Sequence, residues 1–309
     1  MKKHAWLLCL LLVLTLTACG GKAPSEPSAP PVSDTAITVT DMMERTVTLD
    51  GPADKIVVLT AADCEILYAL GAGDRLVGRG AYCDWPAEVL DLPVVASGRE
   101  TNLEQILSLA PQVVVMDDMD QTKEQVAALE NAGIHVVMSD AHSIEGTYES
   151  IRLMGAILGM DAQAEALVAE MEATFAALRE KTADAEPKTV YFEVSPLEFG
   201  LWTAGGHTFM DEIAQMLHLT NLFAELDDWS QISEEQVLAR NPDYIVTVSM
   251  YFGEGPTPEE EILSRAGWEN VTAVKNGNVL NLSNNELTRP SDRLADGAQM
   301  LYEFIYEKD

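Results

Sequence analysis

The amino-acid sequence predicts an α/β protein of two lobes, each a mainly parallel sheet covered by helices, joined by one long helix. Three observations lead to this prediction. Short apolar runs alternate with amphipathic segments in the first half of the chain, the same alternation returns in the second half, and an almost entirely helix-forming stretch separates them. Alternating strands and helices are typical of a parallel sheet with helices on its faces.

The first residues have the pattern of a secretory signal. Two lysines precede an apolar run from Ala5 to Ala18, shorter than the roughly 20 residues that a membrane-spanning helix needs. Leu16 to Cys19 resemble the lipobox of bacterial lipoproteins. We therefore expect residues 1–18 to be a cleaved signal peptide and Cys19 to carry lipid. The alternative is a plain signal peptide with an incidental cysteine, which the Gly, Ser and Pro residues after Cys19 disfavour.

The next stretch lacks an apolar pattern and is rich in Ser and Pro, which predicts a flexible tether. We therefore expect a folded protein that is held by its lipid at the extracytoplasmic face of the cell membrane. The predicted organisation is a signal peptide at 1–18, a lipidated tether at 19–35, an N-terminal lobe at 36–142, a linking helical segment at 143–186 and a C-terminal lobe at 187–309.

Length and composition limit the function classes. The chain has 309 residues, 47% of them hydrophobic, which is enough for two packed lobes. Its formal net charge of −31 argues against nucleic acid as a partner, because a phosphate backbone would repel such a surface. After removal of the signal and lipidation of Cys19, the cysteines Cys64 and Cys83 remain, and the sequence leaves open whether they pair.

In the N-terminal lobe, a short hairpin precedes alternating strands and helices. Residues 37–51 alternate apolar and polar positions on both sides of a polar turn, which predicts the hairpin. A helix from Cys64 is expected to end at Gly71 or Gly73. The other expected elements are strands at 55–60, 75–80, 113–117 and 134–140 and helices at 103–110 and 122–132.

The middle segment predicts one long amphipathic helix. Its apolar residues recur at spacings of three and four, at Ala164, Leu167, Val168, Met171, Phe175 and Leu178. The C-terminal lobe then repeats the alternation. Its expected elements are strands at 188–195, 243–249 and 278–283 and helices at 208–219, 233–241, 256–267 and 291–307.

One octapeptide occurs twice in similar form, as EQILSLAP at 104–111 and as EQVLARNP at 235–242. A polar N-cap residue stands three positions before each Gln, which predicts a capping box, and each Pro stops a short helix before a strand. The N-cap residues are Asn102 and Ser233, the capping residues are Gln105 and Gln236, and the apolar faces are Leu103, Ile106, Leu107 and Ala110 in the first copy and Ile232, Val237 and Leu238 in the second.

The pattern places Glu104 and Glu235 at the second position of their helices, in matched places of the two lobes. A carboxylate in the first turn stabilises a helix through its dipole by about 0.3–1 kcal/mol. The side chain also points away from the apolar face. Two such carboxylates could therefore make a two-point contact with a basic partner.

The chain resembles the substrate-binding lipoproteins of bacterial ABC importers for iron complexes and vitamin B12, the helical-backbone periplasmic-binding family. The segments that carry the resemblance span almost the whole mature chain. They are KIVVLTAADCEILYALGAGDRLVG, AYCDWP, NLEQILSLAPQVVV, the long helix, WSQISEEQVLARNPDYIV and RPSDR.

The resemblance implies two lobes on a rigid helical backbone, with a ligand in the cleft between them. It also implies that Glu104 and Glu235 dock against arginines of an ABC permease, which works with its ATPase. The transported cargo is a metal chelate, either ferric siderophore, haem or cobalamin, so no catalytic cofactor and no resident metal are expected. The protein is then expected to be a monomer and not an enzyme.

Candidate ligand-binding residues follow from the resemblance and from the rule that clefts lie at the carboxyl ends of parallel strands. They are Tyr82, Asp84, Trp85, Trp202, Trp229 and Arg289. Flat aromatic faces suit a corrin, a porphyrin or a catechol. Trp85 could instead pack beneath its loop.

Two further groups of residues are considered for the cleft. His142 or His207 could be a second haem ligand beside Tyr82, but His207 more simply caps the helix that follows it. Arg79, Arg99, Arg289 and Arg293 are available for an anionic siderophore.

Three other classes of protein are less consistent with the sequence. An enzyme would be expected to show a nucleophile elbow, a phosphate loop or a metalloprotease helix, and none of these motifs occurs. A receptor for free zinc or manganese would call for clustered histidines, whereas the histidines here are scattered. A surface scaffold would not need the duplicated lobe.

Overall fold

The computed structural model of this chain describes residues 35–97, 101–118, 123–249, 255–282 and 285–307. The predicted signal peptide, Cys19 and nearly all of the tether lie outside these residues, as does Arg99. Residues 33–309 form one compact unit. Along the described parts of the chain, no helix combines the length and apolar character needed to span a membrane.

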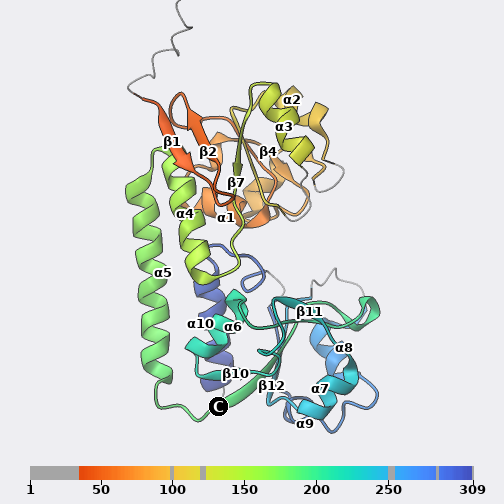
Figure 1. Cartoon of the computed structure of the whole chain (residues 1–309). Helices are drawn as coiled ribbons and strands as arrows, with labels where there is room; N and C mark the ends of the chain where they lie inside the picture. The colour runs from red at the N-terminus through yellow and green to blue at the C-terminus, as the bar shows by residue number, and fades with distance from the viewer. Residues whose placement is uncertain (1–34, 98–100, 119–122, 250–254, 283–284, 308–309) are drawn as a thin grey trace, which may run out of the picture. The chain divides into compact units, whose positions relative to one another are not determined.

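The first sheet has five parallel strands in the order β5-β4-β3-β6-β7. Two of them, β4 and β7, are labelled in Figure 1. Its central strands are buried on both faces, as continuous apolar runs predict. The strands are β3 (Ile56–Val58), β4 (Leu76–Gly80), β5 (Val94–Val95), β6 (Val113–Met116) and β7 (His135–Met138). The helices of this half are α1 (Ala61–Ala69), α2 (Leu103–Leu109) and α3 (Lys123–Asn131), with 3-10 turns η1 (Gly73–Arg75) and η2 (Ala87–Asp91).

A hairpin of β1 (Ile37–Thr40) and β2 (Thr46–Leu49) lies beside this sheet. Its antiparallel pairing confirms the prediction for residues 37–51. The turn is attached to the sheet because Asp41 Oδ2 accepts a hydrogen bond of 3.2 Å from the backbone N–H of Met138.

Two helices follow the first sheet. α4 (Ile144–Leu158) begins at Ser143, whose Oγ accepts from the N–H of Gly146 at 2.9 Å, and it ends at Gly159, which has a φ of 68°. α5 (Asp161–Thr182) is the long helix, with 22 residues. Of its predicted apolar stripe, all but the partly buried Leu167 are buried.

The second sheet has four parallel strands in the order β10-β8-β12-β13. These are β8 (Lys188–Glu193), β10 (Leu219–Asn221), β12 (Tyr244–Thr247) and β13 (Val279–Asn281). Beside them, β9 (Trp202–Ala204) and β11 (Trp229–Gln231) form an antiparallel pair. The remaining elements are η3 (Leu197–Phe199), α6 (Phe209–Met216), α7 (Glu234–Arg240), α8 (Pro258–Ser264), α9 (Thr272–Asn276) and α10 (Leu294–Tyr306).

The two parallel sheets are wound in the same way. In the first, the chain runs outward from β3 to β4 and β5, then crosses to β6 on the other side of β3. In the second, it runs from β8 to β10 and then crosses to β12. Each sheet therefore has a switch point, between β3 and β6 and between β8 and β12, and ligands of α/β proteins bind beside such points. The fold predicted from the sequence is confirmed.

The two octapeptides occupy equivalent places, because α2 leads into β6 and α7 leads into β12. Each helix ends in a left-handed residue directly before proline, Ala110 with a φ of 47° and Asn241 with a φ of 48°. The repeated octapeptide thus corresponds to the same helix and the start of the same strand connection in two similarly wound sheets.

The predicted details of the octapeptides are only partly correct. A complete capping box forms in the second copy, where the N–H of Ser233 donates to Gln236 Oε1 at 2.9 Å. In the first copy Asn102 accepts from the N–H of Gln105 at 3.0 Å, but the Gln105 amide donates to the carbonyl of Val94 instead of returning to the cap. The predicted apolar faces are wrong at Leu107, Leu238 and Ala110, which are exposed. Neighbouring elements cover only one side of each short helix, so these side chains face solvent.

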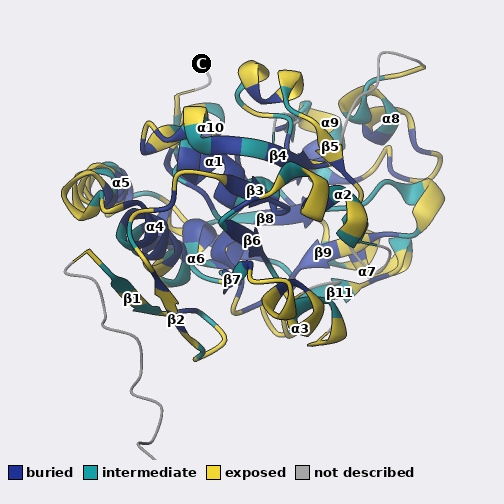
Figure 2. Cartoon of the chain, turned by 90° about the horizontal axis from the view of Figure 1, so that it is seen from above, coloured by how far each residue is buried: buried dark blue, intermediate teal, exposed yellow. Residues whose placement is uncertain are grey.

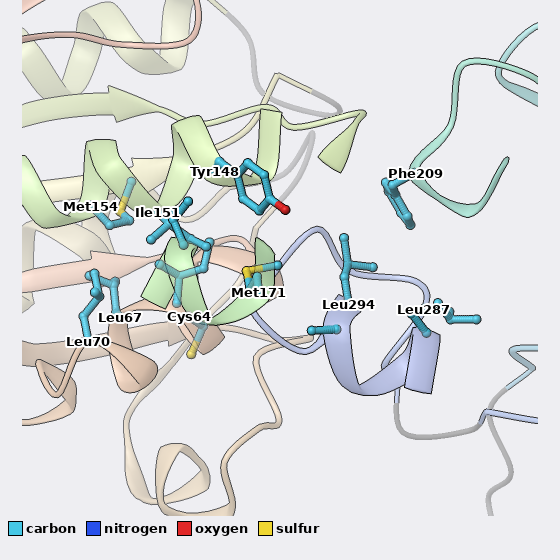
Figure 3. Close-up of a cluster of buried hydrophobic side chains, with 14 of the residues drawn as sticks. Cys64, Leu67, Leu70, Tyr148, Ile151, Met154, Met171, Phe209, Leu287 and Leu294 are labelled. Atoms are coloured by element: carbon cyan, nitrogen blue, oxygen red, sulfur yellow. The ribbon is translucent and has the colours of Figure 1, made fainter. Parts of the chain in front are cut away.

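One apolar cluster crosses from the first half of the chain to the second (Figure 3). Side chains of α4, such as Ile151, lie between those of α1, such as Leu67, and Met171 of α5. The cluster continues to Phe209 of α6 and Leu294 of α10. Seen from above, the strands are buried in the middle while the outer faces of α3, α5 and α8 are exposed (Figure 2).

Gly155 allows the close approach of α4 and α5. A Cβ added to it would collide with the Cβ of Ala164. We expect Gly155→Ala to lower the free energy of unfolding by about 1–3 kcal/mol, because overpacking forces two buried helices apart. Urea unfolding followed by circular dichroism measures the change.

Ala164→Gly is the compensating change, because it removes the atom that the new methyl group meets. It should recover part of the loss in Gly155→Ala, whereas Ala166→Gly, on the exposed face of the same helix, should only add its own cost of about 1 kcal/mol. Equal effects of the two glycine substitutions in the Gly155→Ala background would contradict this account of the packing.

Candidate functional site

A cavity of about 590 Å³ lies where both halves of the chain contribute residues. Much of its wall comes directly after the parallel strands. Thr60 follows β3, Asp117 follows β6 and Ser139 follows β7, and Val194 and Ser195 follow β8 of the second sheet. Strands at both switch points therefore end at one shared cavity, namely β3 and β6 at the first and β8 at the second.

Aromatic side chains form part of the cavity wall. Tyr82, Trp202 and Trp229, three of the predicted ligand-binding residues, line it together. Tyr82 is 74% exposed, so its ring is available to a bound molecule. Trp229 packs edge-to-face on Phe209, with ring centroids 5.6 Å apart, which holds the indole in place. This wall offers flat apolar faces to a ligand.

The cavity wall also carries a buried carboxyl group. Asp63 contacts the hydroxyl of Thr60, and its Oδ1 lies 2.7 Å from Ser139 Oγ and 2.8 Å from Ser150 Oγ. Burial raises the pKa of Asp63 against the effect of these hydrogen bonds, and the charge of Asp140 raises it further.

A hydrogen count supports a protonated Asp63. The two serine oxygens are also only 2.6 Å apart. Three hydroxyl groups supply three hydrogens, whereas the three contacts to Asp63 and the contact between the serines need four. A proton on Asp63 supplies the fourth, so this wall is polar but less anionic than its composition implies.

Arg289 lines the cavity but is already paired. Its Nη1 donates to Glu65 Oε1 at 2.7 Å and to Asp84 Oδ1 at 2.6 Å, and its Nη2 donates to the carbonyl of Tyr82 at 3.0 Å. Burial lowers the pKa of Arg289, but the hydrogen bonds to Asp84 and Glu65 outweigh this and raise it. Arg289 therefore holds the loop that carries Tyr82, with its charge balanced by two carboxylates.

Glu65 of α1 links the first half of the chain to the segment before α10. Besides Arg289, it accepts hydrogen bonds from Ser291 Oγ at 2.6 Å and from Arg293 Nη1 at 3.1 Å. The side chains of Glu65, Arg289 and Arg293 are at most 10% exposed. This ion network fixes the two halves to each other behind the cavity.

The remaining predicted ligand contacts lie away from the cavity wall. Asp84 is turned toward Arg289, and the ring of Trp85 is covered by the guanidinium of Arg293 at 4.4 Å from its centroid. Trp85 is still 47% exposed, so it packs on Arg293 and is not buried beneath its loop. Arg79 is buried and donates to the carbonyl of Cys83 at 3.0 Å, which shapes the same loop.

Cys64 and Cys83 are free and buried. A hydrogen bond to Cys83 and burial raise the pKa of Cys64. Each sulfur also lies near a backbone oxygen, since Cys83 Sγ is 3.3 Å from the carbonyl of Thr60 and Cys64 Sγ is 3.9 Å from that of Trp85.

The histidines differ in position. His142 lines the cavity and its Nε2 lies 3.1 Å from Asp140 Oδ2. The expectation that His207 caps the next helix is wrong, because the cap is Thr208, whose Oγ1 accepts from the N–H of Asp211 at 3.2 Å. His207 is exposed, with a φ of 66°.

The described residues contain no group of three or more His, Cys, Asp or Glu side chains placed to hold a metal ion. A second cavity of about 600 Å³ lies between α4, α5 and α6 and is lined by Glu145, Glu172, Arg179 and Glu212 among others. It lies beside helices and not at strand ends. The first cavity is therefore the candidate site, on grounds of topology.

Glu104 and Glu235 lie on α2 and α7, outside the cavity wall, and both are exposed. Hydrogen bonds from its own backbone N–H and from Ser233 lower the pKa of Glu235. The structure thus separates these two carboxylates from the cavity and places them on equivalent helices.

Sequence reasoning missed several residues of the site. Thr60, Asp117 and Asp140 could have been found, because each lies within two residues of a predicted strand end. Phe209 could not, since it begins a helix and reaches the cavity only through the tertiary structure. Asp63 could not either, because it lies in α1, and the apolar pattern of this helix indicates only packing.

Two similarly wound parallel sheets with one cavity at their shared carboxyl ends define a two-lobed solute receptor. The chain belongs to the periplasmic binding protein family, whose profile matches residues 56–286. This confirms the resemblance found in the sequence.

Relatives support the same class. The chain is 32% identical over 316 residues to YvrC of Bacillus subtilis, an uncharacterised ABC transporter substrate-binding lipoprotein, covering 99% of this chain and 98% of the relative. It is 28% identical over 308 residues to a cobalamin-binding protein of Halobacterium salinarum, covering 95% and 82%. The crystal structure of the periplasmic vitamin B12 binding protein BtuF of Vibrio cholerae superposes with a TM-score of 0.69 at 25% identity, covering 84% and 99%. These relatives are solute-binding proteins and not enzymes.

The ion network behind the cavity leads to a stability prediction. Glu65→Gln should lower the free energy of unfolding by about 3–5 kcal/mol, because two buried guanidinium groups lose their shared carboxylate. Asp84→Asn is the matched control, since Asp84 pairs with the same Arg289 but its side chain is 36% exposed. Its cost should be about 1 kcal/mol or less.

Urea unfolding followed by tryptophan fluorescence compares the two variants. If Glu65→Gln costs no more than Asp84→Asn, the network does not hold the two halves together as described.

Proposed function

We propose that this chain is the substrate-binding component of an ABC importer, held at the extracytoplasmic face of the membrane by lipid on Cys19 after removal of residues 1–18. The 19–35 tether would let the folded part capture a metal chelate and deliver it to the permease. The observation that carries this proposal is the cavity to which strand ends of both sheets contribute, with its aromatic wall. In this role the chain binds and releases its cargo without chemical change.

Among metal chelates, the charges of the cavity favour a corrinoid. Asp117 and Asp140 line it, and the guanidinium of Arg289 is balanced by Glu65 and Asp84. Within the described lining there is no lysine and no second arginine. The carboxylates of haem and the negative charge of many ferric siderophores therefore lack a free cationic partner, whereas a corrin ring with neutral amide side chains meets no such penalty.

The aromatic residues of the cavity also suit this ligand class. Tyr82, Trp202 and Trp229 can cover a flat ring system, while the hydroxyl oxygens around Asp63 can accept hydrogen bonds from amide N–H groups. The relatives named for binding cobalamin support the proposal.

Ligand titration tests the proposal. Cyanocobalamin should bind with a lower Kd than haem or a ferric hydroxamate siderophore, as measured by quenching of tryptophan fluorescence. Trp202→Ala should weaken cyanocobalamin binding by about tenfold or more, since it removes a large aromatic face from the wall. Phe199→Ala is the control, because Phe199 is an exposed aromatic residue of the same half outside the cavity lining.

Preferential binding of haem would contradict the corrinoid assignment. Failure of all three ligands to bind would contradict the chelate receptor itself.

The docking role of the matched glutamates has its own test. Glu104→Ala with Glu235→Ala should leave cyanocobalamin affinity unchanged and abolish permease-dependent uptake, because a two-point contact with basic side chains is lost. Glu124→Ala with Glu259→Ala is the control, since both are exposed glutamates in the first turn of other helices. Uptake of labelled cobalamin by cells that depend on this importer provides the measurement, and uptake by the docking variant at the control's rate would refute the role.

A further inference from the structure

The repeated octapeptides share an exposed leucine in addition to an exposed glutamate. Leu107 is 46% exposed and Leu238 is 36% exposed. The residue before each leucine, Ile106 in α2 and Val237 in α7, is fully buried. Each helix is therefore anchored by one apolar side chain and presents the next to solvent.

Leucine and glutamate lie on one face of each helix. Leu107 follows Glu104 by three positions, and Leu238 follows Glu235 by the same interval. Side chains three apart on a helix are neighbours. Each helix thus presents a carboxylate beside an apolar side chain.

The remaining shared residues have internal roles. Gln105 and Gln236 bond the backbone, and Pro111 and Pro242 follow the left-handed helix ends. The exposed glutamate and leucine are the two shared residues that the packing of α2 and α7 does not require.

The two helices also lie on one side of the protein. In Figure 1 and in the view from above in Figure 2, α2 and α7 are both on the side away from α5. Single exposed leucines are common on protein surfaces and need no explanation. A matched pair at equivalent positions of two sheets, each beside a matched carboxylate, is not explained by chance exposure.

We infer that Leu107 and Leu238 are the apolar half of a two-point docking surface whose occupant is the membrane-embedded subunit of the importer. This inference rests on the proposed function. The partner surface would present, at each of two places, a basic side chain beside an apolar depression. Burial of leucine would exclude water from the adjacent ion pair, which strengthens the contact beyond that of an exposed salt bridge. With a net charge of −31, the chain also favours a basic partner.

The test uses the full-length protein, its permease and ATPase assembled in lipid nanodiscs, and cyanocobalamin as the ligand probe. Leu107→Gln with Leu238→Gln should weaken association with the transporter at least tenfold and leave the Kd for cyanocobalamin unchanged. Met43→Gln with Met300→Gln is the matched control, because these residues are 42% and 39% exposed, one in each half, on the hairpin and on α10. The control pair should associate like the wild type.

Other results would overturn the inference. If the leucine variant associates with the transporter within twofold of the wild type, the leucines are not part of the docking surface. If the methionine control loses as much affinity as the leucine variant, the loss reflects a general effect of surface polarity and not a role of the leucines. If Glu104→Ala with Glu235→Ala abolishes association while the leucine variant does not, the inference fails but the proposed function stands. If the wild-type protein binds cyanocobalamin but not the transporter, or binds neither, the proposed function fails with it.

Discussion

The structure depends on the apolar cluster that α1, α4, α5, α6 and α10 share. Elements from both halves of the chain bury side chains in it, so neither half completes its core without the other. Because a close-packed interior resists displacement, the cluster holds the carboxyl ends of both sheets against one cavity. Gly155 is part of this constraint, since it lets the two connecting helices approach closely.

Buried ion pairs join the two halves of the chain in addition to this shared apolar cluster. The Glu65 network joins α1 to the segment before α10, and Arg289 extends it to the loop that carries Tyr82. Arg289 therefore shapes the cavity, and its positive charge is balanced by Glu65 and Asp84 and is not available to a ligand. The selectivity proposed for this receptor, for a neutral rather than an anionic chelate, is a consequence of how the two halves are joined.

Most of the fold could be predicted from periodicity, because strands buried on both faces read as short apolar runs and helices as stripes. The buried stripe from Ala164 to Leu178 is an example. Details that depend on neighbouring elements could not be predicted. Gln105 bonds Val94 of an adjacent strand instead of its own cap, and Leu107 is exposed although its spacing fits the apolar face.

The sequence by itself determined the two α/β halves, the long helix between them, the matched glutamates and the resemblance to the family, because all of these are encoded in local patterns. Tertiary structure alone decided that the charge of Arg289 is balanced by two carboxylates and that Trp85 packs on Arg293. It also decided that Phe209 and Asp63 line the cavity. The physical reason is that charge balance and exposure depend on partners as far as 228 residues away along the chain. Local patterns contain no information on such partners.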